Sequence, residues 1–133
     1  MKINFDAGVV ALGQFGGIGL VARDSSGQFF AARSTHLSSV NDPLIAEALA
    51  ARAGLSFAVS MGLRHIQVEG DSQSLIRMIK REESPQHKVE VVIHDIWRLV
   101  CLDDATELRC GTQTPAGQVK FPPLLGLLKE VQV

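Results

Sequence analysis

Residues 41–72 read NDPLIAEALAARAGLSFAVSMGLRHIQVEGDS, and they predict a long helix followed by a short strand. Asp42 is a suitable N-cap, and Pro43 suits the first helical position because its φ is already fixed near the helical value. Apolar residues recur at helical spacing to about Met61. Residues 65–69 then alternate like a strand. A helix that leads into a strand is the usual connection of a parallel pair, which indicates a mixed α/β fold.

Upstream of this helix the chain has the pattern of three strands. Residues 2–7 alternate polar and apolar side chains, and residues 17–23 and 28–33 are two further β-rich runs. The polar, glycine-containing residues 24–27 predict an antiparallel hairpin between the second and third strands. We expect the strand at 65–69 to lie parallel to the first strand, after a right-handed crossover. The predicted fold class is α/β, a mixed sheet of three antiparallel strands plus at least one parallel strand, with flanking helices.

Two more helices are predicted downstream. Residues 71–81 form one, opened by the acidic residue after a glycine, and residues 89–101 form the other. After residue 101 neither helical nor strand periodicity is sustained, and glycine and proline are frequent. We therefore expect one domain over residues 1–101 and a poorly specified segment at 102–133 that is not a separate domain.

Composition limits the classes of protein that fit. The 133 residues are 46% hydrophobic with a net charge of −1, which suits one globular domain without the basic surplus of a dedicated nucleic-acid binder. A bound divalent cation would supply the missing positive charge. Cys101 and Cys110 without a secretory leader indicate an intracellular protein of the nucleus or cytoplasm, not a secreted one. No run resembles the roughly 18 apolar residues of a membrane span, so no membrane partner is expected.

Three acids, Asp6, Glu47 and Asp71, stand out by position. Asp6 and Asp71 lie at or just past the ends of neighbouring strands, at the sheet edge where open α/β sheets bind ligands. Glu47 is an isolated charge in an apolar helix. Each has an ordinary alternative: a strand-end turn, a solvent-facing helical stripe, and a helix N-cap. Together they predict a site for Mg²⁺ or Mn²⁺, because close carboxylates repel one another unless a cation holds them. Two such ions, about 4 Å apart, can activate water and stabilise the leaving oxygen of a phosphodiester.

These segments resemble a known family, the plant-type, reverse-transcriptase-associated branch of the RNase H superfamily. The resemblance covers about residues 1–100 and rests on INFDA (3–7), GIGLVARDSSG (17–27), AEALA (46–50) and VEGDS (68–72). It implies a five-stranded mixed sheet and metal-dependent endonucleolytic cleavage of the RNA strand of RNA–DNA hybrids. It also implies an Asp-Glu-Asp-Asp centre, whose first three acids fall on Asp6, Glu47 and Asp71, with Asp6 bridging the metal ions.

The fourth acid and the last strand of the family have no recognisable counterpart, so the C-terminal end of the family pattern is expected to be missing. Asp103, Asp104 and Glu107 are available as substitutes, but their spacing does not support them, and Asp95 fits an exposed helical acid better. Two alternatives to an active nuclease stay open. One is a catalytically impaired nucleic-acid-binding or interaction module, and the other is a truncated product with a marginal fold.

Other motifs predict less. Ser72, Gln73, Ser74 and Arg77, at the start of the second helix, are candidates for contacts with nucleic-acid phosphates, although a solvated helix face is the simpler explanation. The glycine-rich residues 13–19 precede a strand and not a helix, so they do not fit a phosphate loop, and no small organic cofactor is expected. Histidines and cysteines show no zinc-ligand spacing.

Overall fold

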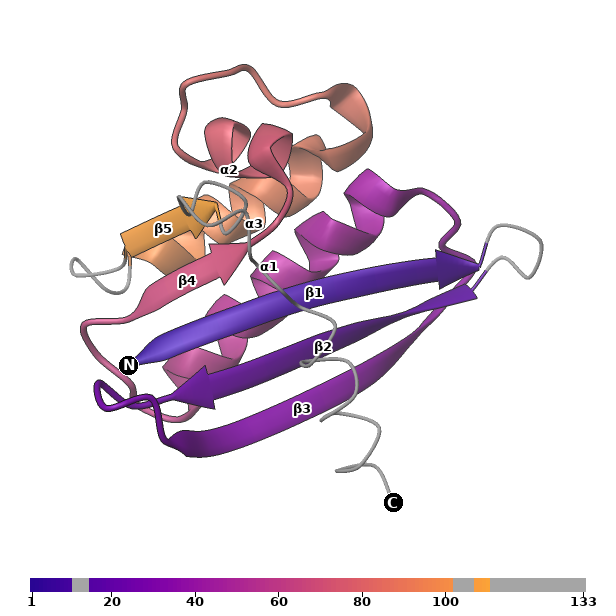
Figure 1. Ribbon diagram of the computed structural model, residues 1–133. Helices are drawn as coiled ribbons and strands as arrows, with labels where there is room; N and C mark the ends of the chain where they lie inside the picture. The colour runs from indigo at the N-terminus through magenta and orange to yellow at the C-terminus, as the bar shows by residue number, and fades with distance from the viewer. Residues whose placement is uncertain (11–14, 102–106, 111–133) are drawn as a thin grey trace.

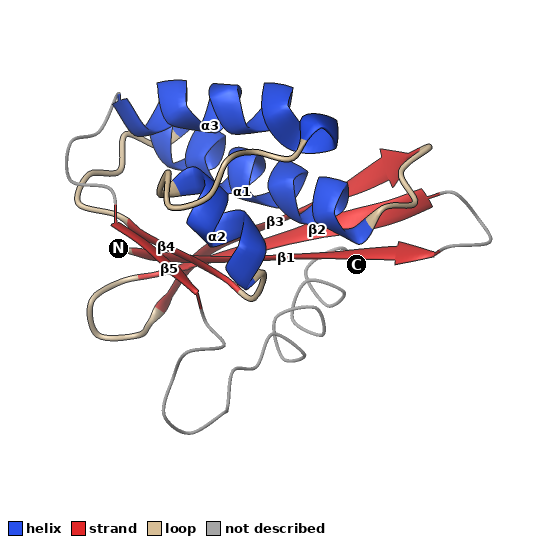
Figure 2. Cartoon of the chain, turned by 90° about the horizontal axis from the view of Figure 1, so that it is seen from above, coloured by secondary structure: helices blue, strands red, loops and turns tan. Residues whose placement is uncertain are grey.

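The computed structural model describes residues 1–10, 15–101 and 107–110 of the chain. Five strands form one sheet in the order β3-β2-β1-β4-β5, and Figure 2 shows the described helices on one side of it. The strands are β1 (Lys2–Val10), β2 (Phe15–Arg23), β3 (Phe29–Ser38), β4 (Gln67–Gly70) and β5 (Glu107–Cys110) (Figure 1). The helices are α1 (Pro43–Ser60), α2 (Gln73–Ile79), the short 3₁₀ helix η1 (His87–Val89) and α3 (Glu90–Cys101).

The sheet is mixed, as the sequence predicted. β1 pairs antiparallel with β2, and β2 antiparallel with β3. β4 lies parallel to β1 on the other side. β1 and β3 extend further than predicted, to Val10 and Ser38, because both pair with β2 along its whole length. Gly27, with φ 84°, closes the β2–β3 hairpin, as expected of a glycine in a tight turn.

β5 contradicts the expectation that the last strand of the family is missing. The backbone of Glu107–Cys110 runs parallel to β4, in register with Gln67–Gly70, and completes the sheet. Its sequence signal is weak, because four alternating residues are too few to establish a period. Residues 102–106 and 111–133 lie outside the described residues, so the boundary expected at residue 101 and the character of the segment after it stay predictions.

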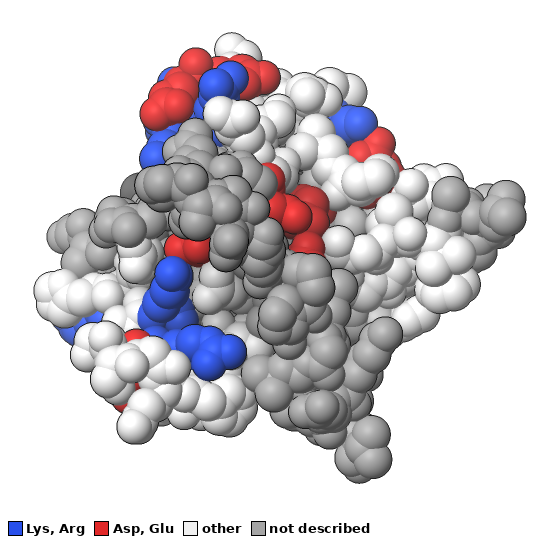
Figure 3. Space-filling view, in the orientation of Figure 1, with Lys and Arg blue, Asp and Glu red and all other residues white. Residues whose placement is uncertain are grey.

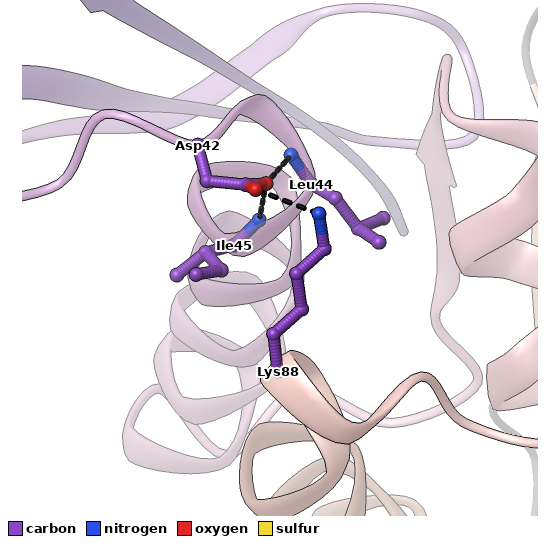
Figure 4. Close-up of polar contacts among 4 residues, drawn as sticks. All are labelled: Asp42, Leu44, Ile45 and Lys88. Atoms are coloured by element: carbon purple, nitrogen blue, oxygen red, sulfur yellow. Dashed lines mark hydrogen bonds and ion pairs between the residues drawn. The ribbon is translucent and has the colours of Figure 1, made fainter.

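The start of α1 follows the predicted cap. Asp42 Oδ1 accepts hydrogen bonds from the backbone amides of Leu44, at 2.8 Å, and Ile45, at 3.2 Å. Lys88 in η1 reaches the other carboxylate oxygen at 2.6 Å (Figure 4). A side-chain cap stabilises a helix by about 0.5–2 kcal/mol. Here the cap also connects the first turn of α1 to the segment that precedes α3.

α1 packs its alanine-rich face on β1 and β2. Small side chains let the helix lie close to Ile3 and Phe5, both completely buried. By length and composition α1 is apolar enough to cross a membrane, contrary to the expectation that no segment of the chain is. Half of α1 is buried inside the structure, where its apolar side chains form part of the core of the domain. This packing explains the apolar composition of the helix. Its buried apolar residues are Ala46, Ala48, Ala50, Ala51, Leu55, Phe57 and Ala58.

Trp97 holds the end of α2 against α3. Its indole Nε1 donates a 2.9 Å hydrogen bond to the carbonyl oxygen of Ile79, and the guanidinium of Arg81 lies 3.9 Å from its ring centroid. Arg81 has a left-handed φ of 64° just after the helix. These contacts fix α2, and the loop before α2 carries one of the candidate acids.

Candidate metal centre

The first candidate acid lies on β1 where β1 runs past the end of β4. The parallel pairs are Lys2–Gln67, Ile3–Val68 and Asn4–Glu69. Asp6 comes two residues after the last pair, in the middle of β1 and not at its end, which corrects the sequence prediction. Asp71 follows the last residue of β4, so the two acids occupy equivalent places on adjacent parallel strands.

α1 supplies the third acid, in its second turn. Oxygen atoms from the carboxylates of Asp6, Glu47 and Asp71 all lie within 4.8 Å of one another. The structure therefore brings together the three acids that the sequence singled out, from three different elements. We refer to them as the acidic triad.

Burial and helix capping exclude two of the ordinary interpretations. Glu47 is only 9% exposed, so it is not part of a solvent-facing stripe. Asp71 does not cap α2, because the N-cap is Ser72, whose hydroxyl accepts a 3.3 Å hydrogen bond from the amide of Leu75. Asp6 is 8% exposed while Asp71 is exposed. The triad is thus buried on one side and accessible to solvent on the other.

The electrostatics of the triad disfavour three negative charges. Desolvation by burial, followed by the charges of Asp71 and Asp6, raises the pKa of Glu47 to about 9. Desolvation and the charge of Asp71 also raise the pKa of Asp6. The expectation that close carboxylates raise each other's pKa is therefore confirmed for these two residues. Without a cation, at least one proton stays in the triad at neutral pH.

Hydrogen bonding leaves room for a ligand at Glu47. The backbone N–H of Ala7 donates to Asp6 Oδ1 at 2.9 Å and to Glu47 Oε1 at 3.2 Å. Glu47 Oε2 is buried and accepts no hydrogen bond from the described part of the chain. A buried carboxylate oxygen without a donor is costly unless a proton or a cation compensates it. Hard oxygen donors of this kind fit Mg²⁺ or Mn²⁺.

The other buried acid is neutralised differently. Glu69, 8% exposed on β4, forms a 3.0 Å ion pair with Lys2 on the neighbouring strand. This pair could not be predicted from the sequence, because only the parallel register of β1 and β4 reveals it. Figure 3 shows acidic side chains near the centre of the face seen in Figure 1, with lysine and arginine side chains on the same face. A net charge near zero thus does not exclude local positive charge.

Asp95 is not part of the triad. Its carboxylate pairs with Arg52 of α1 at 2.8 Å and with Arg98 at 3.6 Å, so it connects α3 to α1. It is a helical acid, as the sequence suggested, but it is only partly exposed because it pairs with Arg52. Asp103 and Asp104, and the side chain of Glu107, lie outside what the structure describes.

The candidate nucleic-acid contacts lie next to the triad in the chain. Ser72 caps α2, and Gln73 and Arg77 are exposed. Ser74 is partly buried. Residues 15–19 of the glycine-rich run lie in β2, as expected, and its first two residues are not described. A functional group that the sequence could not indicate is the backbone N–H of Ala7, because any residue type but proline provides one.

Comparison with known proteins gives a consistent result. A family model described as reverse transcriptase-like matches residues 4–107, whereas comparison with curated protein sequences gives no match. Among solved structures, RNase H1 of the archaeon Halobacterium salinarum has a TM-score of 0.76 at 18% identity, over 82% of this chain and 83% of its own.

Two further structures are similar. A compost-derived RNase H1, solved in complex with an RNA/DNA hybrid, has a TM-score of 0.74 at 16% identity, over 82% of this chain and 83% of its own. A foamy virus RNase H domain has a TM-score of 0.73 at 13% identity, over 98% of this chain and 90% of its own. Identities this low show the fold alone. With the family model spanning most of its length, the chain belongs to the reverse transcriptase-like family and has the RNase H fold.

Proposed function

We propose that this protein is a divalent-metal-dependent nuclease of the RNase H type, which hydrolyses the RNA strand of RNA–DNA hybrids. The observation that carries the proposal is the acidic triad, three carboxylates within 4.8 Å of one another, with one buried oxygen lacking a donor. Such a cluster suits Mg²⁺ or Mn²⁺, and two ions are expected when substrate is bound. We also propose that the protein acts inside the cell, in the nucleus or cytoplasm.

Asp6, Glu47 and Asp71 are the residues that would hold the metal. When bound, the metal supplies positive charge that activates a water and stabilises the leaving oxygen of the phosphodiester. The amide of Ala7 orients one oxygen of Glu47, and this leaves the other oxygen for the cation. Glu47 must release its proton before it can act as a ligand, since its pKa is raised to about 9. Because Asp71 is exposed, the site is open on that side, from which the substrate phosphate would reach the bound metal.

The substrate class follows from the fold and from the exposed neighbours of the triad. A structure with the same fold was solved in complex with an RNA/DNA hybrid, and that observation supports the hybrid as the partner here. Ser72, Gln73, Ser74 and Arg77 are the proposed contacts to its phosphates. They follow Asp71 directly in the chain, and Arg77 is an exposed cation on α2.

The test is incubation of the purified protein with an end-labelled RNA–DNA hybrid and Mg²⁺ or Mn²⁺, beside an Asp71→Asn variant. We expect metal-dependent cuts in the RNA strand that disappear in the variant and in excess EDTA. Duplex DNA and single-stranded RNA of the same sequence serve as substrate controls. Cleavage by the Asp71→Asn variant at the wild-type rate would contradict a role of the triad in catalysis.

The second candidate is a module that binds nucleic acid without cutting it. It is favoured by the observation that the cluster contains three acids among the described residues, where the family resemblance implies four. The same assay separates the two candidates when binding is measured alongside cleavage. Hybrid binding by the wild-type protein with no cleavage in either metal supports the binding module and contradicts the nuclease.

A further inference from the structure

Gly70 and Phe5 are packed against each other, one residue before Asp71 and Asp6 respectively. A Cβ atom placed on Gly70 would lie 2.2 Å from Cζ, 2.5 Å from Cε2 and 2.8 Å from Cε1 of the Phe5 ring. Both residues are buried, and Phe5 is 0% exposed. The ring therefore occupies the space that any side chain at position 70 would need.

The backbone conformation at position 70 does not require a glycine. Gly27 and Gly62 are the glycines with positive φ in the described chain, so Gly70 has a conformation that alanine adopts without strain. A glycine inside a strand commonly marks a close approach by another group. Here that group is the Phe5 ring.

The contact has a direct connection to the triad, because each partner precedes one of its acids. Phe5 is followed by Asp6 on β1, and Gly70 is followed by Asp71 at the end of β4. The last parallel pair is Asn4–Glu69, so this contact is the next one along the two strands. It lies between the last backbone pair and the two carboxylates.

We propose that Gly70 is a positioning residue, which lets the Phe5 ring lie across the end of β4 and thereby sets the distance between the carboxylates of Asp6 and Asp71. This inference rests on the proposed metal site and adds a residue outside the triad that determines its affinity. A larger residue at position 70 displaces either the ring or the end of β4. Either displacement moves one of the two carboxylates relative to the other.

The experiment compares Mn²⁺ binding, by titration calorimetry, for the wild type, Gly70→Ala, Phe5→Leu and the double variant. Leucine lacks the Cζ and Cε atoms that meet the added Cβ. We expect Gly70→Ala to weaken Mn²⁺ binding by about 10- to 100-fold, the range for residues that orient metal ligands. In the Phe5→Leu background the same substitution is expected to have little effect. Far-UV circular dichroism verifies that each variant is folded.

Gly54→Ala is the matched control. Gly54 is also buried, but its added Cβ would meet Ile3 Cγ2 at 3.5 Å and Leu20 Cδ2 at 3.7 Å, which are ordinary contacts. We expect this variant to bind Mn²⁺ like the wild type. Equal weakening by Gly70→Ala in both backgrounds, or none in the wild-type background, overturns the inference while leaving the metal site intact. No binding by the wild type overturns the proposed function itself.

If Gly70→Ala does not fold, the single variant Phe5→Leu tests the proposed positioning role of the Phe5–Gly70 contact. Without the ring, the end of β4 loses the surface against which it packs. We expect the folded Phe5→Leu protein to bind Mn²⁺ more weakly than the wild type, and unchanged affinity contradicts the proposal.

Discussion

The backbone N–H of Ala7 in β1 donates a 3.2 Å hydrogen bond to Oε1 of Glu47 in α1. The same N–H donates to Asp6 at 2.9 Å, so one amide orients two carboxylates that come from different elements. Ala7 lies beyond the last β1–β4 pair, at Asn4. Because β4 ends before this point, the N–H of Ala7 has no backbone partner on β4 and donates to side chains instead. Glu47 is supported on one oxygen, and its other oxygen requires a proton or a cation.

The stability of the metal-free protein is expected to fall as pH rises. Burial raises the pKa of Glu47 in the folded protein to about 9, from an ordinary value of 4.5, so the folded state retains a proton that the unfolded state releases. Between these two values the unfolded state binds fewer protons, and rising pH therefore favours unfolding. The raised pKa of Asp6 acts in the same direction. Denaturant unfolding in EDTA from pH 5 to 9 measures the trend, and Glu47→Gln, which cannot ionise, is expected to flatten most of it.

Metal binding is expected to release protons and to tighten with pH. A cation needs Glu47 ionised, so its apparent affinity rises toward the raised pKa of that carboxyl. Calorimetric titration with Mn²⁺ in two buffers of different ionisation enthalpy, at pH 6 and pH 8, counts the released protons. Affinity that is the same at both values, with no proton release, contradicts the ligand role of Glu47.

Asp95→Asn tests whether this acid acts as a fourth ligand. Its carboxylate pairs with Arg52, whose side chain is 38% exposed, and with Arg98. Because water screens such a pair, we expect a loss of about 0.2–1 kcal/mol in the free energy of unfolding. Mn²⁺ affinity and hybrid cleavage are expected to stay at wild-type values. A large loss of cleavage with the fold intact would place Asp95 in the site after all.

Ser72→Ala and Arg77→Ala are expected to differ in their effect on stability. Ser72→Ala removes the cap of α2 and is expected to lower the free energy of unfolding by about 0.5–2 kcal/mol. Arg77→Ala changes an exposed side chain, so stability is expected to be unchanged while hybrid binding weakens, with the salt slope reduced by about 1. Salt-dependent binding of both variants to a labelled hybrid is the measurement. If Arg77→Ala binds the hybrid like the wild type, Arg77 is not a phosphate contact and belongs to a solvated helix face.

Much of the fold follows from local chemistry. Asp42 and Pro43 mark the start of α1, and the polar turn before β3 predicts the hairpin, because these residues favour one backbone conformation within a few positions. β5 was missed because a four-residue edge strand depends on pairing with β4, which its own sequence does not encode. The cap of α2 was placed one residue early, since Asp71 and Ser72 are both good N-caps.

The acidic triad required topology as well as residue type. Each acid alone had an ordinary explanation, and only the parallel placement of β4 beside β1 suggested that they would meet. The contact of Gly70 with the Phe5 ring could not be inferred in the same way, because it depends on side-chain packing. Sequence patterns therefore indicate which groups meet at the sheet edge, whereas packing determines how closely they do so.

Anomalous diffraction from a crystal soaked in Mn²⁺ addresses the metal centre directly. We expect an anomalous peak within ligand distance, about 2.0–2.3 Å, of carboxylate oxygens of Asp6, Glu47 and Asp71. The peak is expected to disappear in Asp71→Asn crystals soaked in the same way. A wild-type crystal with no peak among these three carboxylates at saturating Mn²⁺ would contradict the account.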